Sequence, residues 1–230
     1  MTARPSVLLL RLSSGQQEAV RWIAIGTMVV DHIGAVLMTP DEALPLRAIG
    51  RVAWPLFAFL LAYNVAVREV DPVRYLRPLL FWGALAQLPH YLAFDRFVIS
   101  ILGTLFLAAA ALSLLAHRER LEQRSPLLVP GLLVVILLGS TQVEYGPVGV
   151  GLVLAFWWAL REGAPLGWLA AVLATALANQ PWPIWPFALI ALPLPFVAAK
   201  LPLSLPRSGR LPWLFYPAHL ALLAGLDRVM

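Results

Sequence analysis

The residues best suited to chemistry are an adjacent pair, Asp31 and His32, inside a long apolar run, and Arg51, which lies near the start of the next run. Histidine is the best general base near neutral pH, and arginine supplies a fixed positive charge. Consecutive helical residues point about 100° apart, so Asp31 cannot orient His32 directly. We therefore expect Asp31 to pair with Arg51, which leaves His32 free to face a substrate.

The elements that position these residues are predicted to lie in a lipid bilayer. The 230 residues are 60% hydrophobic and 13% charged, with a mean hydropathy of +0.80, which leaves too little polar surface to coat a water-soluble globule. We predict an all-α fold, a polytopic transmembrane helical bundle forming a single domain over residues 1–230, with about nine spans (roughly eight to ten). The expected spans are Val20–Met38, Ile49–Val67, Tyr75–Phe94, Phe97–Ala116, Leu127–Ser140, Gly146–Leu160, Pro165–Ala178, Pro183–Ala199 and Leu211–Val229.

Composition also limits the partners and the chemistry. The chain has no cysteine, which excludes disulfides, thiolate zinc sites and cysteine nucleophiles, and we expect no metal. The net charge of +5 comes from basic residues that sit singly between apolar segments, so the expected partner is the lipid bilayer and not nucleic acid. Residues 1–18 are interpreted as a cytoplasmic lead-in, because the apolar run Ser6–Leu10 is too short for a cleavable signal.

The distribution of basic residues predicts the orientation, because cytoplasmic loops retain Lys and Arg. With nine spans and a cytoplasmic N-terminus, only four of the 17 basic residues fall outside, namely Arg47, Arg51, Arg96 and Arg228. The turn at Glu144 and the C-terminus are then outside.

Several other polar residues share a depth with Asp31 and His32 in this orientation. They are His90, Glu144, Tyr145 and Asn179, each near the outer end of a span. A charge inside the membrane costs about 2.5 to 3.5 kcal/mol on insertion scales, so such groups are expected to face one another or water. We predict an outward-facing polar pocket.

The last span carries Tyr216 and His219 in its cytoplasmic half, which separates them by depth from this pocket. A site reached from both faces accommodates this difference. Such a site suits a donor that enters from the cytosol and an acceptor held at the outer surface.

The order of these motifs resembles the TraX family. The run RWIAIGTMVVDHIG from Arg21 to Gly34, followed by Ile49-Gly50-Arg51 and by PLFAFLL at 55–61, is similar to the family's N-terminal signature. Later blocks are Leu88-Pro89, Glu144-Tyr145-Gly146 with Gly149, and Leu214-Phe215-Tyr216-Pro217 with His219. The resemblance covers nearly the whole chain. One departure is Glu144, where the family pattern has aspartate; the charge is retained, but its reach is longer.

This resemblance implies a membrane-embedded acyltransferase of the bacterial inner membrane that N-acetylates the pilin subunit of conjugative pili, with acetyl-CoA as donor. The catalytic candidates are then Asp31, His32, Arg51 and His219. The substrate-binding candidates are His90, Glu144, Tyr145, Asn179 and Tyr216.

The residues themselves permit that reaction. Acyl transfer needs a base for the acceptor proton and donors for the developing oxyanion. We expect His32 to be the base, with His219 as the alternative; direct transfer is expected, and an acyl-histidine intermediate stays open. Phosphates favour arginine clusters, so coenzyme A is expected to meet basic residues of the cytoplasmic loops, namely Arg68, Arg74, Arg77, Lys200, Arg207 and Arg210.

Other functions remain open at this stage. The acceptor of an acyltransferase can also be a glycan or a small molecule. A transporter would place charged residues near mid-membrane too and would need no acetyl-CoA, whereas a structural subunit would need no aligned polar pocket.

Overall fold

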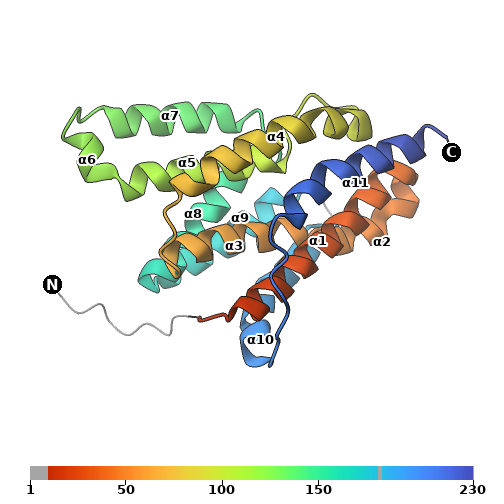
Figure 1. The fold of residues 1–230 in the computed structure, drawn as a ribbon, viewed down its shortest axis with the longest axis horizontal. Helices are drawn as coiled ribbons and strands as arrows, with labels where there is room; N and C mark the ends of the chain where they lie inside the picture. Colours follow the sequence, from red (N-terminus) through yellow and green to blue (C-terminus); the bar gives the residue numbers. More distant parts are fainter. Residues whose placement is uncertain (1–9, 181–182, 230) are drawn as a thin grey trace.

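The computed structural model of the protein describes residues 10–180 and 183–229, and this part of the chain is helical (Figure 1). The helices are α1 (Ser14–Leu37), α2 (Pro40–Gly50), α3 (Ala53–Ala66), α4 (Val73–Phe94), α5 (Ile101–Ala116), α6 (Arg118–Glu122), α7 (Leu128–Ser140), α8 (Gly146–Glu162), α9 (Pro165–Ala178), the 3-10 helix η1 (Trp185–Ala191), α10 (Leu194–Lys200) and α11 (Leu211–Asp227). Residues 1–9 of the predicted lead-in lie outside the described part. The all-α prediction is confirmed.

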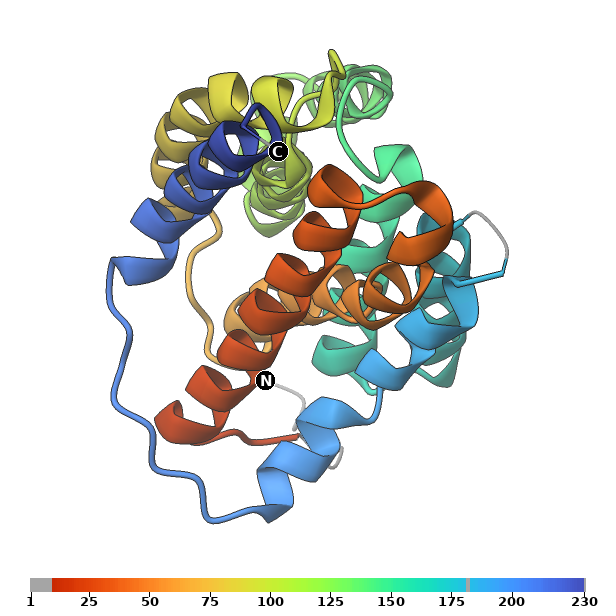
Figure 2. The same ribbon diagram turned by 90° about the vertical axis from the view of Figure 1, so that its right-hand side faces the viewer.

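The helices pack in two connected groups. One consists of α3, α8 and α9, with α5 against α8 and α1 against α3. The other consists of α1, α4 and α11, with α2 folded back on α1 (Figure 2). The core between α3 and α8 is apolar, because Trp54, Leu56 and Phe59 of α3 and Leu152 and Phe156 of α8 are fully or almost fully buried.

The predicted count of nine spans is not confirmed. Within residues 10–180 and 183–229, two helical stretches could cross a membrane by length and composition, Ser14–Leu37 and Pro40–Ala66, and four shorter apolar stretches accompany them. At 1.5 Å per residue, the 13 residues of α7 and the 16 residues of α5 extend about 20 to 24 Å, which is less than a hydrocarbon core of about 30 Å. The expected span Pro183–Ala199 is divided between η1 and α10.

Helix α2 was not predicted, since its charges and Pro45 are typical of a loop. Local signals nevertheless begin a helix here. Thr39 is the N-cap, its capping box is closed by Glu42, and Pro40 occupies the first turn, where its missing N–H costs nothing. This helix places Arg47 and Arg51 one turn apart.

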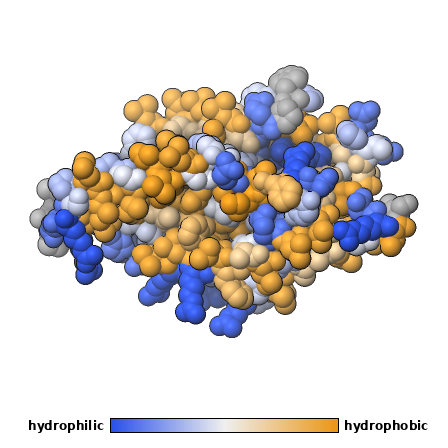
Figure 3. All heavy atoms as spheres, turned by 90° about the horizontal axis from the view of Figure 1, so that it is seen from above, coloured by the Kyte–Doolittle hydropathy of each residue, from blue (hydrophilic) through white to orange (hydrophobic). Residues whose placement is uncertain are grey.

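Apolar side chains also cover much of the outside. Figure 3, seen from the side of α7 and α4, shows broad hydrophobic areas broken by scattered polar groups. Leu80, Leu88, Leu137 and Leu138 on these helices are more than half exposed. Exposed apolar surface of this extent fits a surrounding of lipid.

Candidate functional site

The Asp31 carboxylate lies between two guanidinium groups. Its Oδ2 accepts from Arg47 Nη1 and its Oδ1 accepts from Arg51 Nη2, each at 2.7 Å. The side chains of Asp31 and Arg51 are 11% and 8% exposed, whereas that of Arg47 is 29% exposed. The Asp31–Arg51 pair expected from the sequence is therefore present. The second arginine leaves an excess of one positive charge at this point.

Gly50 allows the end of α2 to approach α1. A Cβ built on Gly50 would overlap the Cβ and carboxylate of Asp31, so no side chain fits there without moving Asp31. Arg51 follows directly and is steadied by a hydrogen bond from its Nε to the Arg47 carbonyl, at 3.2 Å. The glycine thus sets the distance across which the arginines reach the carboxylate.

His32 and His219 contact each other directly. His32 Nδ1 lies 2.8 Å from His219 Nε2, and the two rings are nearly parallel, at 4°. His219 Nδ1 lies 3.0 Å from the Phe215 carbonyl oxygen, which can only accept, so this nitrogen carries the proton. In a neutral His219, Nε2 is then the acceptor, and His32 Nδ1 must donate to it. His32 Nε2 is left without a proton in the neutral pair, and no described residue hydrogen-bonds to it.

The depth expected for His219 was wrong. His219 was expected in the cytoplasmic half because the last span starts on the cytoplasmic side. In the structure, however, the start of α11 lies well along α1 and not beside its first residues. Ser208 Oγ, just before α11, lies 3.2 Å from Arg21 Nη1 on α1, and this pair is separated by 187 residues, as is the histidine pair. The two helices therefore run in step from that contact to the histidine pair.

Aromatic rings join the histidine pair to a third histidine. The Phe94 ring lies 5.1 Å from the ring of His32 and 4.9 Å from that of His90. His90 is buried, and its Nε2 lies 3.4 Å from Glu144 Oε1. Tyr216 is also buried, with its ring 5.5 Å from that of His219. The cluster is thus continuous from α11 to the turn before α8.

That turn holds Tyr145 in an unusual conformation. Its φ of 62° lies in the left-handed region, which is rare for a bulky residue and is often found at functional sites. Its ring stacks on that of Trp54 at 4.6 Å, and Thr104 Oγ1 donates to the Glu144 carbonyl, so both sides of the turn are fixed. Burial raises the pKa of the Tyr145 phenol and keeps it protonated, while Arg51 and Glu144 lie close enough to act on it electrostatically.

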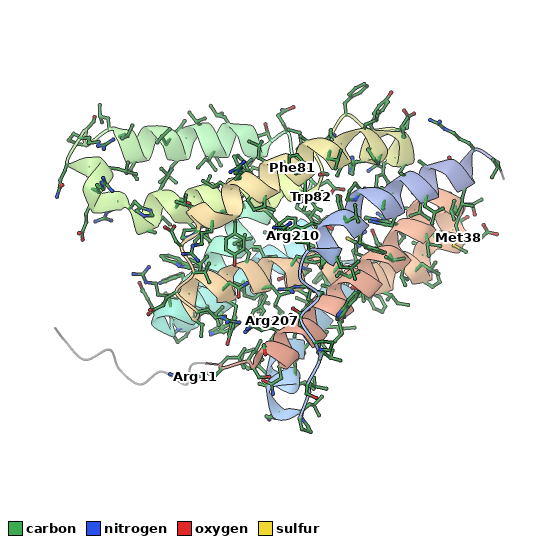
Figure 4. All side chains as sticks on the ribbon, viewed as in Figure 1. Arg11, Met38, Phe81, Trp82, Arg207 and Arg210 are labelled. Carbon is green, nitrogen blue, oxygen red and sulfur yellow. The ribbon has the colours of Figure 1, made fainter. Side chains whose placement is uncertain are left out.

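The structure does not bring every expected residue into this cluster. Asn179 is buried at the end of α9, where its Nδ2 donates to the Thr175 carbonyl one turn earlier. The six basic residues expected to meet coenzyme A are all exposed: Arg68, Arg74, Arg77, Lys200, Arg207 and Arg210. Figure 4 shows Arg207 beside the loop that leads to α11 and Met38 at the far end of α1.

A separate pocket of about 250 Å³ lies at the C-terminal ends of α3, α5 and α8, and none of these six basic residues lines it. It contains Glu69 and Asp71 beside His117 and Arg161, so its charges are mixed and it is not a simple phosphate site. Among the described residues, no group of three or more His, Asp or Glu side chains is arranged to hold a metal ion.

Sequence reasoning missed Arg47, because residues 39–48 lie between the first two expected spans and were placed outside the membrane. A usable signal was present. Arg47 and Arg51 are four residues apart, so a helix presents both on one face. The N-cap Thr39 and Pro40 indicate that helix.

Comparison with protein families covers nearly all of the described chain. A family model described as "TraX protein" matches residues 16–227. The chain belongs to the TraX family. The histidine pair, the Asp31 network and the Glu144 turn all lie within the matched residues, although they come from both ends and the middle of the chain.

Two relatives are similar to parts or most of this TraX-family chain. "Protein TraX" of Escherichia coli is 33% identical over 81 residues, 35% of this chain and 32% of that protein, so the match spans about a third of its length. "Probable fimbrial assembly protein FimC, serogroup H1" of Dichelobacter nodosus is 31% identical over 231 residues, 88% of this chain and 92% of that protein. No solved structure matches this chain.

Proposed function

We propose that this protein is an acetyltransferase of the bacterial inner membrane that moves an acetyl group from cytosolic acetyl-CoA to the N-terminal amine of a pilin subunit at the outer side. Membership of the TraX family and a relative named for fimbrial assembly support the pilin acceptor. The observation that carries the chemistry is the His32–His219 contact at 2.8 Å, because it supplies a base with a defined free nitrogen.

In this proposal the nitrogen of the acceptor amine bonds to the acetyl carbon, and His32 Nε2 accepts the proton that the amine loses. The C–S bond of the donor then breaks, and coenzyme A leaves as the thiol with that proton. His219 does not touch the substrate. It is a positioning residue that accepts from His32 Nδ1 and so keeps the proton off Nε2.

The Asp31 network supplies positive charge near the reacting atoms. One carboxylate shared by two guanidiniums leaves N–H groups of Arg47 and Arg51 unmatched by anions. Such fixed donors stabilise an oxyanion most where water is excluded. Glu144, 32% exposed at the outer turn, is placed to attract a cationic amine before it is deprotonated.

The test compares three variants by transfer of labelled acetyl from acetyl-CoA to a pilin subunit in detergent. His32→Ala should fold and lose about 10²- to 10⁴-fold in kcat, the usual share of positioned proton transfer. His219→Ala should lose less, and His219→Gln should recover part of that loss, because its amide oxygen can again accept from His32 Nδ1.

His117→Ala is the matched control, since that histidine bonds only within its own segment, to the Ser113 carbonyl. It should transfer acetyl at the rate of the unaltered protein. Near-normal transfer by His32→Ala with abolition by His219→Ala would exchange the two roles. No transfer by the unaltered protein, and no binding of coenzyme A, would favour transport.

A further inference from the structure

A groove lies beside the cluster, where α4, α5 and α7 meet. Helix α5 packs against both α4 and α7, and the space between them has a volume of about 410 Å³. The lining comes from all three helices and from the two turns at the outer end: Leu79, Leu80, Gly83, Ala84, Gln87, Ile99, Gly103, Phe106, Leu107, Gly139 and Val143. Leu80 is 60% exposed, so the groove is open to the outside of the helix bundle.

The groove is lined by apolar side chains with one exception. The exception, Gln87, already bonds within the chain through both of its amide atoms: Nε2 donates to the Val98 carbonyl at 2.9 Å, and Oε1 accepts from Ser100 N at 3.2 Å. A polar ligand would lose its hydrogen bonds to water without replacement, at a cost of about 1 to 3 kcal/mol for each group. The occupant is therefore apolar where it lies in the groove.

Two of the three glycines in the lining are not required by packing within the chain. A Cβ on Gly83 would meet the nearest side chain at 3.5 Å and one on Gly139 at 3.9 Å, both ordinary contacts. Only Gly103 is crowded, by Ile99. Gly83 and Gly139 thus leave space that a side chain of this protein could fill, and they keep the groove open.

The outer end of the groove adjoins the candidate site. Ile99 and Val143, which line it, are joined through the backbone, and Glu144 N donates to the Ile99 carbonyl at 2.9 Å. The Glu144 carboxylate follows immediately and reaches His90, one turn beyond Gln87 on α4. An occupant with a cationic amine at its outer end meets a carboxylate there.

The size of the groove limits what enters it. From Leu79 to Gln87 along α4 is about 12 Å, so 410 Å³ corresponds to a cross-section of about 34 Å². A whole helix with its side chains, about 10 to 12 Å across, needs about 80 to 110 Å². One row of side chains from a helix lying against the protein fits this section.

We propose that the groove is the docking site for an apolar transmembrane helix of the acceptor protein, which places one row of side chains between α4, α5 and α7 and its amine beside Glu144. This rests on the proposed function. It deepens that function by naming a membrane-inserted segment, besides the amine, as what the enzyme recognises.

The first experiment fills the groove. Gly139→Leu narrows it, and Gly131→Leu on the same helix is the control, because nothing lies within 4 Å of a Cβ at Gly131. Transfer is measured to a full-length pilin subunit in phospholipid vesicles and to a short soluble peptide with the same N-terminus. Losing the burial of one Leu-sized side chain weakens binding about tenfold or more. Gly139→Leu should therefore raise KM for the full-length subunit and so lower its kcat/KM about tenfold. The kcat/KM for the peptide should not change.

Equal effects of Gly139→Leu on both substrates, or no effect on either, would overturn the docking site. A second experiment does not depend on transfer. In this cysteine-free chain, Leu80→Cys at the groove and Leu173→Cys on α9, both more than half exposed, are tested for crosslinking to single cysteines in the pilin transmembrane segment.

Crosslinking at Leu80→Cys but not at Leu173→Cys supports docking, even if the unaltered protein transfers no acetyl and the proposed function fails. Acetyl transfer without any crosslink at Leu80→Cys means that the groove holds only lipid. That result overturns docking and leaves the proposed function standing.

Discussion

Replacing Asp31 with asparagine tests whether the carboxylate holds α1 to α2. Asparagine keeps the shape of the side chain but removes its charge and turns an N–H₂ group toward a guanidinium. Arg47 and Arg51 then face each other without the anion that each contacts at 2.7 Å. We expect Asp31→Asn to unfold more easily and to lose activity as well.

The magnitude follows from the burial of each partner. Leaving one member of a buried ion pair without its partner costs about 3 to 5 kcal/mol, and the 8% exposure of Arg51 puts it in this class. Arg47, at 29%, is better solvated and adds about 0 to 1 kcal/mol. The free energy of unfolding should therefore fall by about 3 to 6 kcal/mol in Asp31→Asn. Arg47→Met keeps the buried pair intact and should cost about 1 kcal/mol at most.

The measurement is reversible unfolding in detergent micelles, followed by circular dichroism. Asp41→Asn is the control, since it makes the same chemical change at an exposed position in the first turn of α2, where a lost helix-dipole interaction costs about 0.3 to 1 kcal/mol. If Asp31→Asn is as stable as Asp41→Asn, the Asp31 carboxylate does not hold α1 to α2, and the reasoning from buried charge fails.

Two further predictions concern the approach of the helices and the orientation of the chain. Gly50→Ala should displace Asp31 and reduce both stability and acetyl transfer. Gly26→Ala, inside α1 with open space around its Cβ, should leave transfer unchanged and should not lower stability, because alanine favours a helix more than glycine does; a thermal melt and a transfer assay of both variants decide this. A cysteine placed at Arg120, in the loop predicted to be cytoplasmic, should resist an impermeant external reagent, while one placed at Glu144 should react. Labelling at Arg120 from outside would reverse the predicted topology.

Hydropathy predicted most of the helices, because apolar runs such as Ile101–Ala116 form helices wherever they are buried in protein or lipid. It also predicted the pairing of Asp31 with Arg51, since two isolated opposite charges in apolar segments have few other partners. Arg47 was missed because it lies between two expected spans, where hydropathy predicts no helix. Single-residue hydropathy carries no information on local hydrogen bonds.

The contact between His32 and His219 could not be derived from hydropathy either. Span counting treats every segment as starting at the same membrane level. The level at which α11 begins is set instead by the segment before it, which is tied to α1 through Gln16, Arg21 and Ser208. These bonds join polar groups that lie far apart in the sequence, and no periodicity in the sequence reports them.

The histidine pair joins the first helix of the described chain to the last, across a separation of 187 residues. During synthesis α1 reaches the membrane early, but its histidine has no partner until α11 has been translated and inserted. In a nascent or truncated chain that lacks α11, His219 is missing, so nothing selects between the two tautomers of His32. Under the proposed mechanism, a protein interrupted before residue 211 therefore lacks the partner that keeps the proton off His32 Nε2, and it should transfer acetyl no faster than His219→Ala.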